Sequence, residues 1–339
     1  MNILAVESSC DETAVAIVRD GREILTDCIA SQEAEHRIYG GVVPEIASRK
    51  HVEAIYGLAD EALAKTGLSR SDIDAVAVTY APGLIGAVLV GVNFAKAAAL
   101  ALNKPLIPVH HIRGHIAANY LAFPELKPPF LCLVVSGGHT MIVEVEDYTK
   151  MRILGTTLDD AAGECFDKVG RVLGMPYPGG AALDKAAQAG NDKSYPMPRP
   201  KPGENPYDMS FSGLKTAALN TIHHAEQVVG EEIDIPGLCA SFCAAVSDTL
   251  VPRVVMALKE TGHRQLAVAG GVAANSVIRR DILAAAEKLG VKVYLPPLSL
   301  CGDNAAMIGS QAYYEYQAGN TAGMELNAYA TKSILGEAL

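Results

Sequence analysis

Three of the nine histidines, His110, His111 and His115, fall within the eleven-residue stretch HHIRGHIAANY. His111 and His115 are four residues apart, so on a helix both imidazoles lie on one face and could chelate a divalent ion. The alternative is a surface helix that carries histidines with no ligand. His110 would point elsewhere, and we expect it to end a strand or to cap the helix.

The residues around this pair limit the chemistry. Ile112 follows His111, at the position where HExxH metalloproteases carry their general-base glutamate, so a protease would lack its base. No thiolate lies nearby, and a bound metal would take oxygen or water as its remaining ligands. Two histidines and one carboxylate leave coordination positions open, which suits iron(II) or zinc holding a substrate. Among 38 acidic residues, the pattern alone does not choose the carboxylate.

Two segments with the same pattern must position such a site. NILAVESSCDETAVAIV, from Asn2, reads as an apolar strand, a polar turn and a second apolar strand. FLCLVVSGGHTMIVEV, from Phe130, repeats the design with glycines in the turn. Both segments predict β-hairpins, and their repetition in the two halves of the chain predicts an internally duplicated fold.

The rest of the chain alternates strands with helices. The segments 75–102 and 263–297 each read as a strand, a glycine-containing turn and a helix, and a further strand ends the second one. This order predicts an α/β protein with sheets buried between helices. Met197–Asp208 carries prolines at positions 198, 200, 202 and 206, which predicts an irregular surface segment.

Three turns, ESSCDET, VSGGHT and AGGVAANS, follow apolar strands and could bring backbone amides close to a phosphate. None has the P-loop or the Rossmann pattern. Phosphate-binding hairpins in both halves resemble the actin, Hsp70 and hexokinase-like ATPase superfamily (ASKHA). That resemblance implies a duplicated two-lobe fold with an interlobe cleft. We expect residues 1–110 plus about 305–335 to form the N-terminal lobe and 111–304 the C-terminal lobe.

Composition narrows the functional classes. A formal net charge of -10 argues against a protein that coats nucleic acid by bulk electrostatics. The seven cysteines are scattered without a CxxC pair, which is typical of reduced thiols in the cytoplasm. The uncharged run 75–95 is interrupted by Pro82 and glycines, so we interpret it as buried core. We therefore expect a soluble cytoplasmic protein with no membrane partner.

Several motifs together resemble one family, the tRNA threonylcarbamoyladenosine transferases (TsaD, once labelled O-sialoglycoprotein endopeptidases). They are ESSCDET, YGGVVPEIASRKH, TYAPGLIGAVLVG, HHIRGHIAA, VSGGHT and SLCGDNAAMIG. The resemblance implies that His111, His115 and Asp303 hold one divalent metal ion, Fe(2+) or Zn(2+). Considered alone, Asp303 would be the N-cap of the helix starting NAAMIG, and the two roles can coexist.

The same resemblance implies substrate contacts, which are Val134, Val135, Ser136, Gly137, Gly138, Asp167, Gly180, Asp184 and Asn275. Asp11 and Glu12 occupy the first hairpin turn, where carboxylates could position a metal-bound group or an incoming amine. Asp11 could also accept the proton of that amine, which is our hypothesis for the catalytic step. The alternative is a plain acidic turn.

By resemblance, the reaction is an acyl transfer. It moves the threonylcarbamoyl group from threonylcarbamoyl-AMP to the N6 amine of the adenosine 3′ of the anticodon, in tRNAs that read ANN codons. The implied partners are tRNA, a shorter TsaB-like paralogue and a small TsaE-like ATPase. Two alternatives remain open. One is an ATPase or small-molecule kinase of the same superfamily, and the other is a non-catalytic scaffold subunit.

Overall fold

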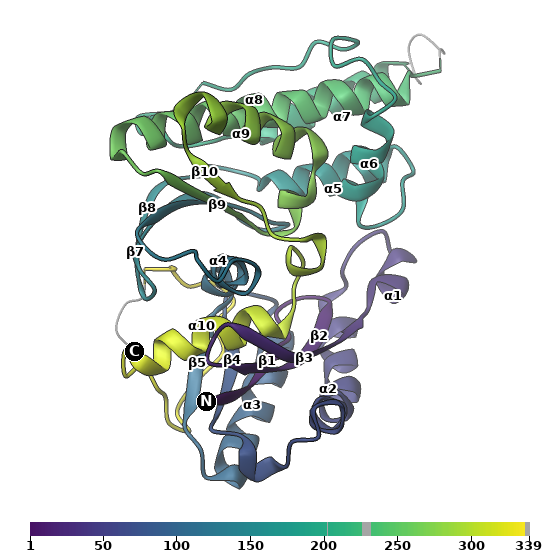
Figure 1. Ribbon diagram of the computed structural model, residues 1–339. Helices are drawn as coiled ribbons and strands as arrows, with labels where there is room; N and C mark the ends of the chain where they lie inside the picture. Colours follow the sequence, from purple (N-terminus) through teal and green to yellow (C-terminus); the bar gives the residue numbers. More distant parts are fainter. Residues whose placement is uncertain (202, 226–231, 336–339) are drawn as a thin grey trace. The chain divides into compact units, whose positions relative to one another are not determined.

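The structure, a computed structural model, describes residues 1–201, 203–225 and 232–335. Its elements divide into two compact units (Figure 1). The first comprises Met1–Pro128, Glu146–Met151 and the chain from Pro296 onward, and the second comprises Pro129–Val145 and Arg152–Leu295. Pro202 lies outside the described residues. The described part of Met197–Asp208 forms neither helix nor strand, as predicted.

The first unit is built on a five-stranded sheet in the order β3-β2-β1-β4-β5. The strands are β1 (Asn2–Glu7), β2 (Glu12–Arg19), β3 (Glu23–Ser31), β4 (Ala75–Ala81) and β5 (Leu106–His110). β1 and β2 pair antiparallel, which confirms the first predicted hairpin, while β4 and β5 run parallel to β1 and to each other. Parallel strands next to a hairpin align the carboxyl ends of β1, β4 and β5.

Helices cover both faces of this sheet. They are α1 (Glu33–Arg37), α2 (Pro44–Thr66), α3 (Ile85–Leu102), α4 (His111–Ala122) and α10 (Ala305–Gln317), with short 3-10 turns at Arg70–Asp72 and Leu298–Leu300. Side chains alternate between the faces of a strand. Leu4 and Val6 of β1 thus enter the core with α2 and α3, whereas Ile3 and Ala5 pack against α10. Burial on both faces explains why β1 is apolar almost throughout.

The second unit repeats the topology. Its sheet has the order β10-β9-β6-β7-β8, and β6 pairs antiparallel with β7 and parallel with β9. The strands are β6 (Phe130–Val135), β7 (Thr140–Asp147), β8 (Lys150–Thr156), β9 (Gln265–Ala269) and β10 (Lys292–Tyr294). Read in reverse, this order corresponds strand for strand to the first sheet. The predicted internal duplication of an α/β fold is therefore confirmed.

In the described part of the second unit, α-helices and a 3-10 turn accompany the sheet. They are α5 (Ala162–Val172), α6 (Gly179–Ala187), α7 (Ser212–His224), α8 (Ile235–Thr261), α9 (Ser276–Leu289) and the turn Gly271–Ala274. The predicted order of strand, glycine turn, helix and strand in 263–297 is confirmed by β9, this turn, α9 and β10.

The division into units differs from the predicted lobe boundaries. We expected residues 1–110 plus about 305–335 in the N-terminal lobe and 111–304 in the C-terminal lobe. Residues 111–128 and 296–304 belong to the first unit, because α4 packs along α10. Ser310 donates to the carbonyl of Ala117, and Arg113 pairs with Glu315 at 2.9 Å. The hairpin tip 146–151 also joins the first unit, where Tyr148 stacks on Tyr314 with 3.8 Å between ring centroids.

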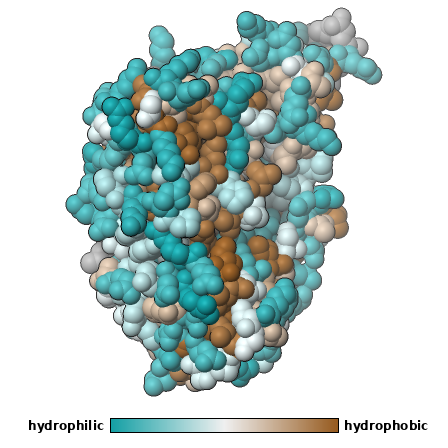
Figure 2. All heavy atoms as spheres, viewed as in Figure 1, coloured by the Kyte–Doolittle hydropathy of each residue, from teal (hydrophilic) through white to brown (hydrophobic). Residues whose placement is uncertain are grey.

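Within the described residues, α3 and α8 are long and apolar enough to span a membrane by length and composition, and 33% and 72% of an 18-residue apolar stretch of each are buried. β4 is buried throughout, and α3 contributes Val88, Val92 and Ala95 to the core. The apolar run 75–95 is thus mainly core, although Ile85 and Leu89 are exposed. On the face shown in Figure 2, hydrophilic residues surround the exposed hydrophobic ones. All seven cysteines are free thiols.

Candidate metal centre

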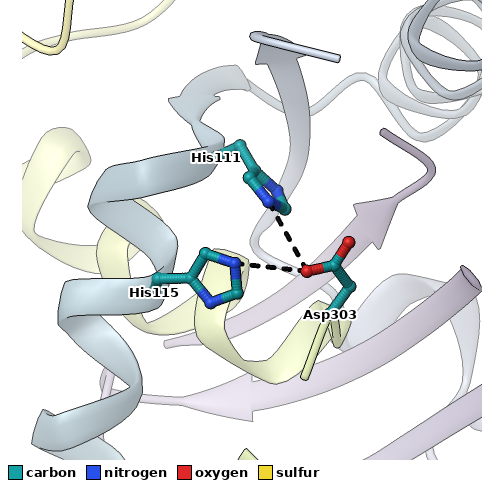
Figure 3. Close-up of side chains that lie close together, drawn as sticks. All are labelled: His111, His115 and Asp303. Carbon is teal, nitrogen blue, oxygen red and sulfur yellow. Dashed lines mark ion pairs between the residues drawn. The ribbon is translucent and has the colours of Figure 1, made fainter. Parts of the chain in front are cut away.

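The first unit brings together the three residues for which the sequence indicated a metal site. β5 ends at His110 and α4 begins at His111, so His111 and His115 lie one helical turn apart on the same face, as predicted. Asp303 comes from the segment before α10 and points at both imidazoles (Figure 3). Its Oδ1 lies 3.5 Å from His111 Nε2 and 3.2 Å from His115 Nε2.

These distances suit a shared cation. Ligand atoms about 2.0–2.2 Å from one zinc ion lie about 2.8–3.6 Å apart when the angle between them is about 90–110°. One nitrogen or oxygen ligand atom from each of His111, His115 and Asp303 lies within 4.8 Å of the others. Among the residues that the structure describes, these form the one group of this kind.

His115 provides an independent test of this fit. Its side chain is 1% exposed, and neither ring nitrogen has a hydrogen-bond partner in the structure. A buried polar group without a partner costs about 1–3 kcal/mol. A cation bound at Nε2 would satisfy one of the two nitrogens, so the histidine is placed as a ligand would be.

His110 has the structural role that the sequence predicted. It is the last residue of β5 and the N-cap of α4, where its Nδ1 accepts a hydrogen bond from the amide of Ile112. Its Nε2 donates to the carbonyl of Lys332. Asp303, by contrast, is not the N-cap of α10. Asn304 has that role, since its Oδ1 accepts from Met307 N at 2.8 Å, and the Asp303 carboxylate points at the histidines instead.

A buried carboxylate contacts His111 on the ring nitrogen that does not face Asp303. Glu7, at the end of β1, is 0% exposed, and its Oε2 lies 3.0 Å from His111 Nδ1. Burial opposes the charge on His111, yet the Asp303 and Glu7 carboxylates raise its pKa to about 9. Burial opposes the charge on Glu7 as well, yet His111 holds the pKa of Glu7 below its usual range. The pocket is therefore electronegative and favours a cation.

This pKa leads to a prediction about metal affinity. Below pH 9 a metal ion must displace the proton on His111, because the imidazole is charged in the metal-free protein. The apparent affinity for Zn(2+) should rise about tenfold per pH unit from about pH 6.5 to 8.5 and level off above about pH 9. Competition with a chromophoric chelator at several pH values measures this slope. An affinity independent of pH over that range would contradict the prediction.

The acidic turn after β1 lies in the same unit. Asp11 is buried and Glu12 partly so. Burial raises the pKa of Glu12 to about 9, and the carboxylates of Asp11 and Asp303 add to the effect. Glu12 is therefore protonated near pH 7 and can donate a hydrogen bond, whereas it cannot serve as a base there.

The backbone of this turn is held by residues that the sequence did not indicate as functional. His51 of α2 donates from Nε2 to the carbonyl of Cys10 and receives the Thr13 hydroxyl at Nδ1, at 2.9 and 2.7 Å. Burial lowers the pKa of His51, which keeps the ring neutral and able to make both bonds. The backbone N–H of Gln32 donates to the Asp11 carbonyl. His51 lies in the family motif YGGVVPEIASRKH, which was the signal for it.

In the second unit, Ser136, Gly137 and Gly138 lie in the hairpin between β6 and β7, which we call the SGG hairpin. Its glycines offer main-chain groups to a ligand rather than side chains. Val134 and Val135 are buried and pair with β7, so only their main chains could reach a ligand, whereas Gly137 and Gly138 are exposed. Two glycines outside the hairpin lie so close to its backbone that a side chain would not fit there. A Cβ on Gly163 would lie 2.4 Å from the carbonyl oxygen of Ser136, and one on Gly270, whose φ is +93°, would lie 2.5 Å from that of Val135.

The remaining predicted contacts in this unit act on neighbouring elements. Asp167 accepts hydrogen bonds from the amides of Gly179 and Gly180 at the start of α6. Asp184 accepts from the amide and hydroxyl of Ser276. Asn275 is the N-cap of α9. Each side chain therefore orders a helix start beside a glycine-containing turn.

Fold and sequence comparisons identify the class and then the family. The solved structure of T. kodakarensis HypF is 15% identical, with a TM-score of 0.63 over 96% of this chain and 49% of that one. The chain thus has the duplicated actin, Hsp70 and hexokinase-like fold. Residues 23–310 match the family TsaD: tRNA N6-adenosine threonylcarbamoyltransferase. The chain belongs to this family.

Two relatives show how closely the chain follows the family. The tRNA N6-adenosine threonylcarbamoyltransferase of Moorella thermoacetica is 58% identical over 96% of this chain and 95% of its own length. The tRNA N6-adenosine threonylcarbamoyltransferase of Clostridium botulinum (strain 657 / Type Ba4) is 51% identical over 97% of this chain and 96% of its own length. The resemblance seen in the motifs thus extends over almost the whole chain.

Proposed function

We propose that this chain transfers the threonylcarbamoyl group from threonylcarbamoyl-AMP to the N6 amine of the adenosine 3′ of the anticodon, in tRNAs that read ANN codons. Membership of the family supports the reaction class. The observation that carries the proposal for this chain is His115, a buried histidine without hydrogen-bond partners that faces Asp303 beside His111.

His111, His115 and Asp303 would hold Fe(2+) or Zn(2+), since two imidazoles and one carboxylate suit either ion. When bound, the ion would hold the threonyl part and polarise an acyl oxygen, worth several kcal/mol of transition-state stabilisation. The three side chains leave further coordination positions for the substrate, because they supply only three ligand atoms.

The chain's own groups complete the transfer. The N6–carbon bond forms as the carbon–oxygen bond to the phosphate of AMP breaks, and the proton of N6 goes to a base. Asp11 is that base in our proposal, because its neighbour Glu12 is protonated near neutral pH. AMP is a good leaving group, so no nucleophilic serine or cysteine is required. Placement of the weakly nucleophilic amine contributes most, up to about 7–11 kcal/mol.

Within the second unit, the proposed substrate contacts are mainly backbone groups. The amides of the exposed residues Gly137 and Gly138 would suit a phosphate or a developing oxyanion, where one donor is typically worth about 2.7–4 kcal/mol. Asp167, Gly180, Asp184 and Asn275 would support nucleotide or acyl contacts through the helix starts that they order. Val134, Val135 and Ser136 would contribute through the main chain.

The proposal includes partners and a compartment. With a net charge of -10, the chain carries little bulk attraction for RNA, so we expect a shorter TsaB-like paralogue and a small TsaE-like ATPase to share tRNA docking. The free thiols of all seven cysteines suit a reducing cytoplasm.

Nucleoside mass spectrometry tests the proposed reaction. The purified chain, with and without the two partner proteins, is incubated with threonylcarbamoyl-AMP and an unmodified tRNA transcript. We expect threonylcarbamoyladenosine in the digest, and none from a matched transcript with guanosine at the target position. Absence of product even with both partners, together with phosphate release from ATP by this chain alone, would replace the proposal with the ATPase alternative.

A further inference from the structure

Glu7 is the first residue of the family motif ESSCDET, but neither the sequence pattern nor the resemblance gave it a role. It is the only charged residue in the strand NILAVE, and its carboxylate is 0% exposed. A buried carboxylate is costly unless hydrogen bonds compensate for lost water. Three groups lie within hydrogen-bond distance of the carboxylate oxygens.

The amide of Ser9 donates to Oε1 at 2.6 Å, and the hydroxyl of Thr79 donates to Oε2 at 2.6 Å. Ser9 lies in the turn after β1 and Thr79 lies within the neighbouring strand β4, and the two donors bind different oxygens, so they fix the carboxylate plane. The third neighbour is His111 Nδ1, 3.0 Å from Oε2. The Ser9 hydroxyl lies 3.2 Å from the same nitrogen.

An ionised carboxylate only accepts hydrogen bonds, so Nδ1 of His111 must carry the proton that faces Oε2. The lone pair of the neutral ring is then on Nε2, the nitrogen that points at Asp303. Histidines that bind metal ions commonly donate their other ring N–H to a carboxylate, which fixes the tautomer and the ring orientation.

We propose that Glu7 is a positioning residue that holds His111 in the Nδ1–H tautomer with Nε2 turned toward the metal-binding position. The inference rests on the proposed metal site, but it concerns Glu7, a buried residue that supplies no ligand atom to that site. His115 has no equivalent partner, since neither of its ring nitrogens is hydrogen-bonded. Glu7 therefore orders one of the two imidazole ligands specifically.

The test compares Glu7→Gln with Glu315→Gln. Glutamine keeps the shape of Glu7 but replaces one acceptor oxygen with an NH2 group, so it cannot accept from all three donors. Glu315 is a matched control, because it is a buried carboxylate that binds another residue of α4, Arg113, at 2.9 Å. Co(2+) affinity and the visible spectrum of the Co(2+) form are measured for the full chain and both variants.

We expect Glu7→Gln to weaken Co(2+) binding by about 10–100-fold and to shift the visible bands, as is typical when the partner of a ligand histidine is lost. Glu315→Gln should bind Co(2+) within about threefold of the parent chain. Equal affinity and spectra for Glu7→Gln and the parent chain would overturn the inference and leave the transfer reaction intact. A parent chain that binds no Co(2+) or Zn(2+) would overturn both the metal site and the role of Glu7.

A variant-free measurement covers the case in which Glu7→Gln does not fold. In the zinc form labelled with 15N at histidine, the His111 signals should show a protonated Nδ1 and a metal-bound Nε2. Metal bound at Nδ1, or a proton on Nε2, would contradict the inference.

Discussion

Replacing His115 with alanine should abolish metal-dependent stabilisation and lower the rate of transfer by about 100-fold or more. The rate estimate follows from several kcal/mol of metal-derived stabilisation, at about 1.4 kcal/mol per tenfold. Zn(2+) at 100 times its Kd should stabilise the parent chain by about 2.7 kcal/mol and raise its Tm. The variant should show almost no shift. Elemental analysis and thermal unfolding with and without Zn(2+) measure both effects.

His36 provides the matched control. It is also a fully buried histidine of the first unit, but both ring nitrogens are hydrogen-bonded, Nε2 to Gln32 Oε1 and Nδ1 to the amide of Val43. Without metal, His36→Ala should cost more stability than His115→Ala, since only His36 loses hydrogen bonds. With Zn(2+), His36→Ala should keep the Tm increase. A Zn(2+) response that survives in His115→Ala would rule out His115 as a ligand.

The sequence predicted the parts of this fold that depend on local patterns. Both hairpins, the strand and helix of 75–102, and the shared face of His111 and His115 follow from the periods of strand and helix, and the structure confirms them. The pairing of Glu7 with His111 joins residues 104 positions apart, which no local pattern encodes. The sheet order β1-β4-β5, with the three strands parallel, brings them together.

Motif resemblance has a different limit. It indicated Asp303 together with His111 and His115, and the structure brings these three side chains close to one another. The local rule that made Asp303 the N-cap of α10 was wrong by one residue. An N-cap residue has extended backbone, and its side chain accepts a hydrogen bond from an amide in the first helical turn. Asn304 meets both conditions. The predicted lobe boundaries differed for a similar reason, because the packing of α4 on α10 is a long-range contact.

Asp11→Asn should reduce the single-turnover rate by about 100- to 10,000-fold, the range expected when a general base is lost. Glu12→Gln should reduce it by much less, under about tenfold, because glutamine resembles a protonated carboxyl group in shape and still donates a hydrogen bond. The two variants change neighbouring residues of one turn by a single atom each, so they are a matched pair. Full activity in Asp11→Asn would show that another group accepts the proton.

The pH dependence of the transfer rate distinguishes the role of Glu12 from that of Asp11. Glu12 is protonated below its pKa of about 9, so the rate should fall as pH rises through about 9 and a second negative charge appears beside Asp11. Glu12→Gln cannot ionise, and its rate should stay level across that range. The same group affects stability, because the folded chain binds a proton at Glu12 that the unfolded chain releases above about pH 4.5. The parent chain therefore loses stability between about pH 4.5 and 9, and Glu12→Gln should have the higher Tm at pH 9 but not at pH 4.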